Sequence, residues 1–147
     1  MRTKTSIYFE VKFQYEKTNE DGMMKKVTEQ YAVDALSFSE AENRIIKEMT
    51  SFYSGDTAVK AISIAPYHEI FFDDRESADK FYKAKLDYVT IDEKTEKEKK
   101  TTMVYLVQAD NLEQARKNII DVMSGAMVDY VIQSIAETKI IDVFEHE

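Results

Sequence analysis

The sequence predicts an α+β fold in which one unit of strand, strand, helix, strand and short strand occurs twice. The first observation is a repeat at a shift of about 74 residues: the stretch Tyr-Ala-Val-Asp-Ala-Leu-Ser-Phe-Ser-Glu-Ala-Glu-Asn-Arg-Ile-Ile begins at Tyr31, and its counterpart Tyr-Leu-Val-Gln-Ala-Asp-Asn-Leu-Glu-Gln-Ala-Arg-Lys-Asn-Ile-Ile begins at Tyr105. The second is strict apolar–polar alternation ahead of each stretch, and the third is a helix-capping pattern inside each. We therefore expect a tandem pseudo-twofold repeat with antiparallel sheets and one helix per copy.

The chain of 147 residues is long enough for two small half-domains that share a core. One helix over a few strands buries little apolar surface by itself. We assign residues 1–73 to copy one and residues 74–147 to copy two, and we expect the copies to pack together as one compact domain.

Copy one begins with residues 7–15, where Ile7, Phe9, Val11, Phe13 and Tyr15 take one side of a strand. A turn around Gly22 leads to a returning strand over residues 25–33. Ser37 and Glu40 form a capping box. The helix that follows has an apolar stripe and closes at residues 55–56, and strands over residues 58–65 and 68–72 complete the copy. The stripe consists of Phe38, Ala41, Ile45, Met49 and Phe52.

Copy two repeats this order after a polar linker over residues 73–80. Strands are expected over residues 81–89 and 99–108, with Tyr82, Ala84, Leu86 and Tyr88 facing inward. Asn111 caps a helix that ends at Gly125. Its stripe consists of Leu112, Ala115, Ile119 and Met123. Strands over residues 130–136 and 140–144 finish the chain.

Composition excludes several classes of function. The chain has no cysteine, and its only histidines are His68 and His146, so nucleophilic catalysis has little support. Its three glycines are isolated, which excludes a phosphate-binding loop. The acidic residues of the linker, Asp73, Asp74, Glu76 and Asp79, lack the spacing of a calcium loop. We expect no catalytic residues, no metal and no cofactor.

Charge and hydropathy bear on location and partners. The net charge is −8, with −3 in the first 73 residues and −5 in the rest, which counts against strong non-specific binding to nucleic acid. A local basic stripe can still act within a Debye length. No apolar run approaches a membrane span and no signal peptide is evident, so we expect a cytoplasmic protein without membrane contact.

Three segments carry a resemblance: Phe-Glu-Val-Lys-Phe from Phe9, the run over residues 33–42, and Glu-Thr-Lys-Ile-Ile-Asp-Val-Phe from Glu137. They resemble a domain-of-unknown-function family of gut bacteria and their phages, over nearly the whole chain. That family implies no agreed activity, site or cofactor. The tandem layout is more loosely similar to the two-repeat single-strand-binding folds of the Whirly and Pur type, which is a likeness of architecture alone.

The outward strand faces offer the most specific candidate site. Copy one presents Tyr8 and Lys12 there, copy two presents Phe81, Lys83 and Lys85, and the lysine pairs 25–26 and 99–100 match under the shift. Rings that stack on bases beside lysines that meet phosphates are typical of single-strand binding. The predicted nucleic-acid site comprises Tyr8, Lys12, Lys25, Lys26, Phe81, Lys83, Lys85, Lys99 and Lys100. The alternative is that both rings are buried and the lysines only keep the sheet edges soluble.

The leading hypothesis is a non-enzymatic single-stranded nucleic-acid-binding protein of phage or bacterial DNA replication or repair. The alternative is an interaction module that binds another protein, in host defence or replication, through an acidic surface or an exposed sheet edge. An enzyme ranks third. The acidic end with one aromatic, residues 142–147, fits either a recruiting tip or a folded strand. Open sheet edges also allow a homo-oligomer.

Overall fold

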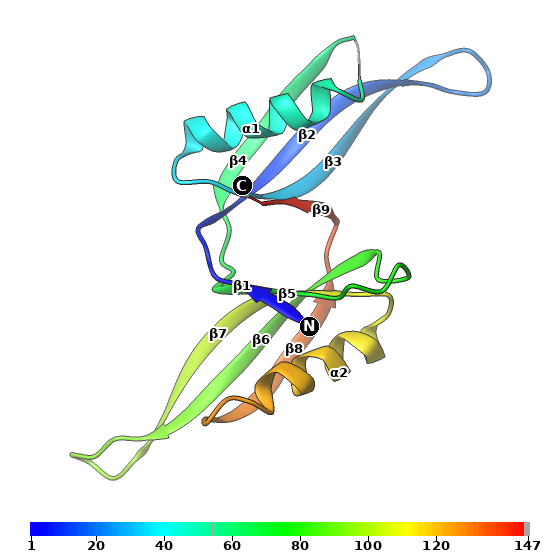
Figure 1. Ribbon diagram of the computed structural model, residues 1–147. Coiled ribbons are helices and arrows are strands. Elements are labelled where there is room, and N and C mark those ends of the chain that lie inside the picture. Colours follow the sequence, from blue (N-terminus) through cyan, green and yellow to red (C-terminus); the bar gives the residue numbers. More distant parts are fainter. Residues whose placement is uncertain (54, 146–147) are drawn as a thin grey trace. The chain divides into compact units, whose positions relative to one another are not determined.

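The computed structural model describes residues 1–53 and 55–145 (Figure 1). As predicted, the chain is α+β, and the described residues form two helices and two mostly antiparallel sheets. The same order of elements occurs twice, which is consistent with a two-copy arrangement. The chain divides into two compact units. Unit 1 contains Met1–Thr5 and Pro66–Thr138, and unit 2 contains Ser6–Ala65 and the segment from Lys139.

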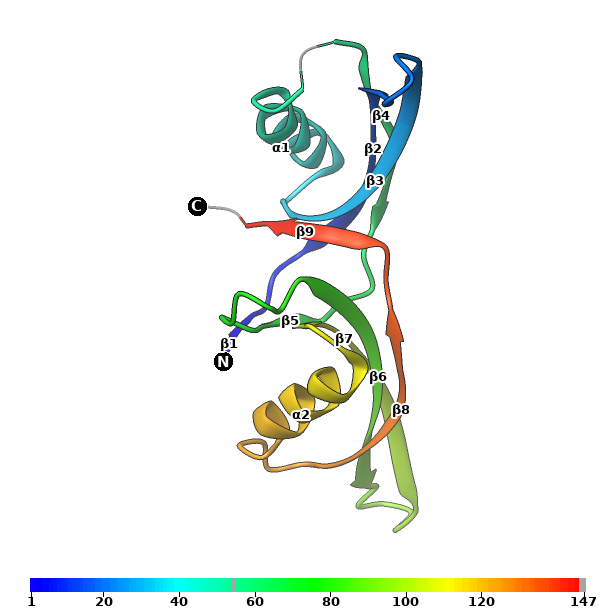
Figure 2. The ribbon, with the colours of Figure 1, turned by 90° about the vertical axis from the view of Figure 1, so that its right-hand side faces the viewer.

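Unit 2 consists of a four-stranded sheet with one helix on one face (Figure 2). The strand order is β4-β2-β3-β9, in which the β2–β3 and β2–β4 pairs are antiparallel and β9 runs parallel to β3. The elements are β2 (Tyr8–Thr18), β3 (Met24–Asp34), α1 (Phe38–Thr50), β4 (Thr57–Ile64) and β9 (Ile140–Phe144).

Unit 1 has the corresponding layout with one additional strand. Its order is β1-β5-β7-β6-β8, where β5 runs parallel to β7 and the other pairs are antiparallel. The elements are β1 (Arg2–Lys4), β5 (Glu69–Phe72), β6 (Lys80–Ile91), β7 (Glu98–Ala109), α2 (Leu112–Met123) and β8 (Asp129–Glu137).

Unit 1 takes β1 and β5 from the first half of the sequence, and unit 2 takes β9 from the second half. β5 follows β4 along the chain but pairs with β7 in unit 1, whereas β9 follows β8 but pairs with β3 in unit 2. The short segment between β4 and β5, and the two residues between β8 and β9, therefore pass from one unit into the other. The compact units have other boundaries than the predicted sequence copies over residues 1–73 and 74–147. The division into those two copies therefore stays a prediction from the sequence.

A buried carboxylate fastens the chain at the end of β5. Asp73, only 7% exposed, accepts hydrogen bonds from Arg75 Nη2 at 2.8 Å and from Asn118 Nδ2 of α2 at 2.9 Å. The Arg75 guanidinium lowers the pKa of Asp73 to about 2. The expectation of a solvated linker is therefore wrong at its first residue. In unit 2 a related contact joins Arg44 of α1 to the backbone oxygen of Glu145, just after β9.

The predicted alternation places the core in both units. Alternate side chains of β2 and β3 pack against Ala41, Ile45 and Met49 of α1, and the equivalent side chains of β6 and β7 pack against Ala115, Ile119 and Met123 of α2. These contacts bury the inward sets that period-two patterning predicts. Ile7 is the exception: it precedes β2 and is 51% exposed.

Both helices begin where the capping patterns predict. Ser37 accepts a hydrogen bond from the Glu40 amide, and Asn111 accepts one from the Gln114 amide. The end of α1 differs from expectation, because Ser51 is its C-cap and the helix stops well before Gly55, whereas α2 ends as predicted, with Ser124 as its C-cap and Gly125 directly after it. Phe52 therefore lies outside α1 and is 74% exposed, and the first-turn residues of the two stripes, Phe38 and Leu112, are also exposed.

Each hairpin extends past the region that its helix covers, as Figure 1 shows for β2–β3 and β6–β7. We call these extensions the arms, residues 16–26 and 90–100. Gly22 turns the first arm with a φ of 82°, a conformation that favours glycine. The first arm has three lysines and three acidic residues, and the second has four of each. The arms are thus neutral in a chain whose net charge is −8.

Candidate functional site

The two aromatic residues of the predicted site are buried. Tyr8 is 1% exposed and Phe81 is 3% exposed, so neither ring offers a face on which a base could stack. The expectation that these rings face water is therefore wrong. Period-two alternation identifies which residues share a face of a strand, but it cannot tell whether that face is covered.

Strand pleating separates the predicted lysines of unit 2. Lys12 and Lys26 lie on the sheet face away from α1, and Lys26 stands directly opposite Glu16. Lys25, its neighbour in sequence, lies on the face that carries α1, because successive side chains point to opposite sides of a strand. The two lysines of the pair 25–26 cannot act on the same side of the sheet.

The lysines of unit 1 divide in the same way. Lys83, Lys85 and Lys100 share the sheet face away from α2, whereas Lys99 lies on the opposite face. Asp87 also lies on the face of Lys83, where it accepts hydrogen bonds from Thr102 Oγ1 at 2.9 Å and Gln133 Nε2 at 2.7 Å. Glu98 and Asp129 share this face too, so its carboxylates match its three lysines in number, and it has no exposed ring from the predicted set.

The structure brings a different set of residues together on the first arm. Lys17 is the direct cross-strand partner of Lys25, on the face that carries α1. Opposite residues of an antiparallel pair have Cβ atoms about 5 Å apart, and like charges there repel each other. Both lysines are exposed, and among the described residues neither has an ion-pair partner. This lysine pair is well placed to receive an anion.

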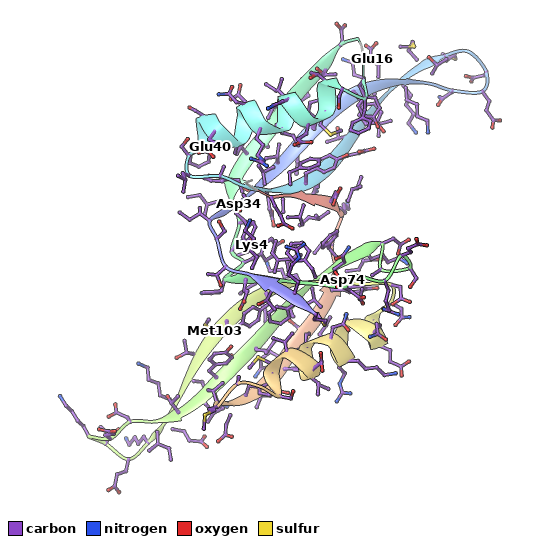
Figure 3. All side chains as sticks on the ribbon, viewed as in Figure 1. Lys4, Glu16, Asp34, Glu40, Asp74 and Met103 are labelled. Atoms are coloured by element: carbon purple, nitrogen blue, oxygen red, sulfur yellow. The ribbon has the colours of Figure 1, made fainter. Side chains whose placement is uncertain are left out.

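Aromatic side chains surround a pocket beside the lysine pair. The pocket has a volume of about 230 Å³ and is lined by Tyr15, Tyr53 and Phe52 together with Glu16, Met24 and residues 55–57. Tyr15 precedes Lys17 by two residues and shares its face, and its ring stacks on Tyr53 with centroids 3.9 Å apart. Figure 3 labels Glu16, at the end of the sheet where α1 finishes. We call the lysine pair, Phe52 and this pocket the arm site.

A carboxylate between two tyrosines holds one wall of the arm site in place. Glu29 accepts a hydrogen bond from Tyr15 Oη at 2.5 Å and another from Tyr31 Oη. The bond to Glu29, followed by burial, raises the pKa of Tyr15, and burial followed by the bond to Glu29 raises the pKa of Tyr31. Tyr31 also stacks on Phe144 of β9, with ring centroids 5.2 Å apart. The wall is therefore fixed before any ligand arrives.

Unit 1 lacks this carboxylate. There Met103 occupies the position that Glu29 holds in unit 2, and the hydroxyls of Tyr88 and Tyr105 bond directly to each other. The cross-strand partner of Lys99 is Thr90, so unit 1 also has no equivalent of the lysine pair. The two units thus have the same order of elements but differ in charge: Met103 replaces the carboxylate of Glu29, and Thr90 replaces one lysine of the pair.

Metal-binding side chains are not gathered in the described part of the chain. No group of three His, Cys, Asp or Glu residues there could hold a metal ion. His68 receives the Val104 amide hydrogen on Nδ1 at 3.2 Å, which ties it to the edge of β7. His146 lies outside the described residues. Within the same residues, no helix is both long and apolar enough to cross a membrane.

Sequence reasoning missed Lys17 and Phe52. Lys17 could have been found by pairing residues outward from the turn at Gly22, which places it opposite Lys25. Phe52 gave no such signal, because it continues the apolar stripe of α1 at the correct spacing although the helix ends at Thr50.

The comparisons with known proteins identify a family but no activity. A search of curated proteins found no match, and a search of solved structures found none. One family model, described as Domain of unknown function (DUF4494), matches residues 7–146. That match covers strands β2 to β9, both helices and the arm site, and leaves out β1. The chain therefore belongs to the DUF4494 family of domains of unknown function.

Proposed function

We propose that this protein binds single-stranded nucleic acid at the arm site and has no enzymatic activity. The observation that carries the proposal is the lysine pair Lys17–Lys25 beside an exposed aromatic ring, Phe52, and a pocket walled by tyrosines. Nucleic-acid strands are bound without sequence preference by this combination of cations for phosphates and rings for bases.

In this mechanism a backbone phosphate lies between the two ammonium groups. Two like charges about 5 Å apart in water repel by roughly 1 kcal/mol, so a shared phosphate removes a repulsion as well as adding two attractions. The adjacent base stacks on Phe52 or enters the pocket beside Tyr53. Glu16 and Asp56 also line the pocket, and their charge disfavours entry of the phosphates themselves.

The lysines of the outward face of unit 1 offer phosphate contacts of their own, apart from the arm site. Lys83, Lys85 and Lys100 share that face, so a strand lying along β6 meets them in turn. This face contributes charge without stacking, because Phe81 is buried. We expect it to add affinity that depends on salt and not on the base.

The setting we propose is phage or bacterial DNA replication or repair. Its support is the resemblance of the strand and capping-box segments to a family of gut bacteria and their phages, together with the looser likeness to two-repeat single-strand-binding folds. A protein partner is the second candidate function, and the observation that favours it is the open edge of β4.

The test is a titration of a fluorescently labelled single strand, followed by anisotropy at low and at moderate salt. Wild type should bind with an affinity that falls steeply as salt rises. The double variant Lys17→Glu/Lys25→Glu should bind much more weakly and lower the salt slope by about 0.7, because the two lysines share one phosphate and each phosphate contact on a single strand contributes about 0.7. Phe52→Ala should weaken binding by about 1–3 kcal/mol with the slope unchanged.

The matched control is Lys94→Glu/Lys97→Glu in the turn of the second arm, which changes the net charge equally. If this control weakens binding as much as the arm-site variant does, net charge alone explains the effect and the arm site is wrong. Lys83→Glu/Lys85→Glu measures the contribution of the outward face. Absence of binding by wild type at low salt rejects nucleic acid as the ligand and favours a protein partner.

A further inference from the structure

The edge strand β4 of the sheet in unit 2 has few of the features that prevent an edge strand from pairing with another strand. β4 ends the strand order β4-β2-β3-β9, so among the described residues one of its sides has no strand partner. Its sequence, Thr-Ala-Val-Lys-Ala-Ile-Ser-Ile, contains a single charge, whereas β8 at the matching edge of unit 1 begins with Asp129 and ends with Glu137. Natural edge strands usually carry charges or irregularities that prevent pairing, and β4 has only Lys60 at a bulge.

A groove runs along this edge. It has a volume of about 400 Å³ and lies between α1 and β4, with Phe13, Glu42 and Ile46 in its walls and residues 57–62 of β4 along its side. The helix and the edge strand run in opposite directions, because only residues 51–56 connect the end of α1 to the start of β4 (Figure 1). A strand added antiparallel to β4 would therefore run in the same direction as α1.

The helix wall sets the chemistry of an occupant. Glu42 and Ile46 are four residues apart on α1 and both line the groove. Four residues of α-helix rise about 6 Å, and side chains two apart on one face of a strand are spaced about 6.6 Å. Two alternate side chains of an added strand can thus meet Glu42 and Ile46 at once. Among the described residues Glu42 has no partner of its own, so a cation is the complement it lacks.

We propose that this groove binds an extended segment of another protein, which adds to β4 as an antiparallel strand and carries a basic residue, any residue and then an apolar residue in that order. The basic side chain lies beside Glu42 and the apolar one packs on Ile46 and Phe13. Backbone hydrogen bonds to β4 supply affinity and the two side chains supply specificity, as in other cases of strand addition. This groove adjoins the arm site at Thr57, which lines both, and the proposal does not depend on the proposed function.

The same sheet already accepts a short strand at its other edge. β9 has five residues, comes from the far end of the sequence, and pairs with β3. The order of the motif follows from the direction of α1: an antiparallel strand reaches Glu42 before Ile46, whereas a parallel one would need the reverse sequence. Antiparallel pairing is slightly the more stable of the two.

Copy two provides an internal comparison. Under the repeat shift, Arg116 and Ile120 of α2 match Glu42 and Ile46 of α1. The apolar position is kept and the charge is reversed, so a basic segment suits unit 2 and not unit 1. A charge swap at Glu42 should therefore change which peptide binds without altering how it binds.

The experiment titrates the whole protein with a labelled peptide, Ser-Thr-Lys-Thr-Ile-Thr-Ser, acetylated and amidated at its ends. We expect wild type to bind it, and to bind Ser-Thr-Ile-Thr-Lys-Thr-Ser or Ser-Thr-Glu-Thr-Ile-Thr-Ser at least about fivefold more weakly. Glu42→Lys should exchange the preference between the lysine and glutamate peptides. Glu93→Lys, the same charge change in the second arm, should leave the preference as in wild type.

Backbone pairing is tested separately with a lysine peptide that is N-methylated at alternate residues, since methylation removes the donors and keeps the side chains. This peptide should not bind. The proposal is overturned if wild type binds no peptide up to about 1 mM, if the methylated peptide binds equally well, or if the Glu42→Lys variant, folded by circular dichroism, keeps the wild-type preference.

Discussion

Replacing Asp73 by asparagine tests how firmly β5 is held in unit 1. The carboxylate accepts hydrogen bonds from Arg75 Nε to Oδ1 at 3.0 Å and from Arg75 Nη2 to Oδ2 at 2.8 Å. It also accepts the Asn118 side-chain amide at 2.9 Å and the Arg75 backbone amide at 3.1 Å. Asn at this position keeps the shape but loses the charge and one of the acceptor oxygens.

The size of the effect follows from the pKa of Asp73. The bonds to Arg75 lower it from 3.8 to about 2, in opposition to burial, which raises it. A shift of one unit corresponds to about 1.4 kcal/mol. The Arg75 side chain is 46% exposed, so water screens part of this interaction. We expect Asp73→Asn to lower the free energy of unfolding of unit 1 by about 2 kcal/mol near pH 6.

The sign of the pH dependence is fixed by the direction of the shift. A depressed carboxyl pKa stabilises the fold above the unfolded value of 3.8, and the stabilisation is lost as pH falls toward about 2. The difference between wild type and Asp73→Asn should therefore be constant above about pH 5 and shrink below it. Urea unfolding followed by circular dichroism measures the difference, and hydrogen exchange of the β5 and β7 amides assigns it to unit 1.

Asp110→Asn is the matched control. Asp110 binds the same guanidinium at 2.8 Å but its side chain is 26% exposed, so its loss should cost less than the loss of Asp73. If Asp73→Asn costs no more than Asp110→Asn, or if its cost does not change between pH 6 and pH 2.5, the carboxylate does not fasten β5 and the reasoning fails.

Three further predictions concern the rest of the fold. Tyr15, Tyr31 and Tyr105 should ionise well above pH 10 in an absorbance titration, because burial and hydrogen bonds raise their pKa values, and stability should begin to fall as pH rises past 10; a single ordinary titration of all tyrosines would contradict this. Deleting the chain from residue 139 should raise amide exchange in β3 while β6 and β7 keep their protection, because only unit 2 loses a strand; equal loss in both units would count against separate compact units. Gly22→Ala should destabilise the protein by about 1 kcal/mol through its φ of 82°, since no atom lies within 4 Å of an added Cβ; a neutral result in urea unfolding would show that the turn relaxes.

Local patterns in the sequence determined much of this protein. The alternation of β2 and β6 fixed which side chains enter the core, and Ser37 and Asn111 fixed where the helices begin. The duplicated order of elements was also readable, because periodicity and capping depend on residues a few positions apart. The family match over residues 7–146 agrees with the extent of the resemblance.

The tertiary structure alone decided where the exchanged strands pair and which outward faces are covered. An edge strand offers the same backbone groups to any partner, so nothing within β5 or β9 states which sheet receives it. Period-two alternation placed Tyr8 and Phe81 on the outward strand faces but left open whether those faces are covered, and both residues are buried. The joining of Lys17, Lys25 and Phe52 into one site depended on where α1 ends, which is a matter of packing between distant segments and not of local periodicity.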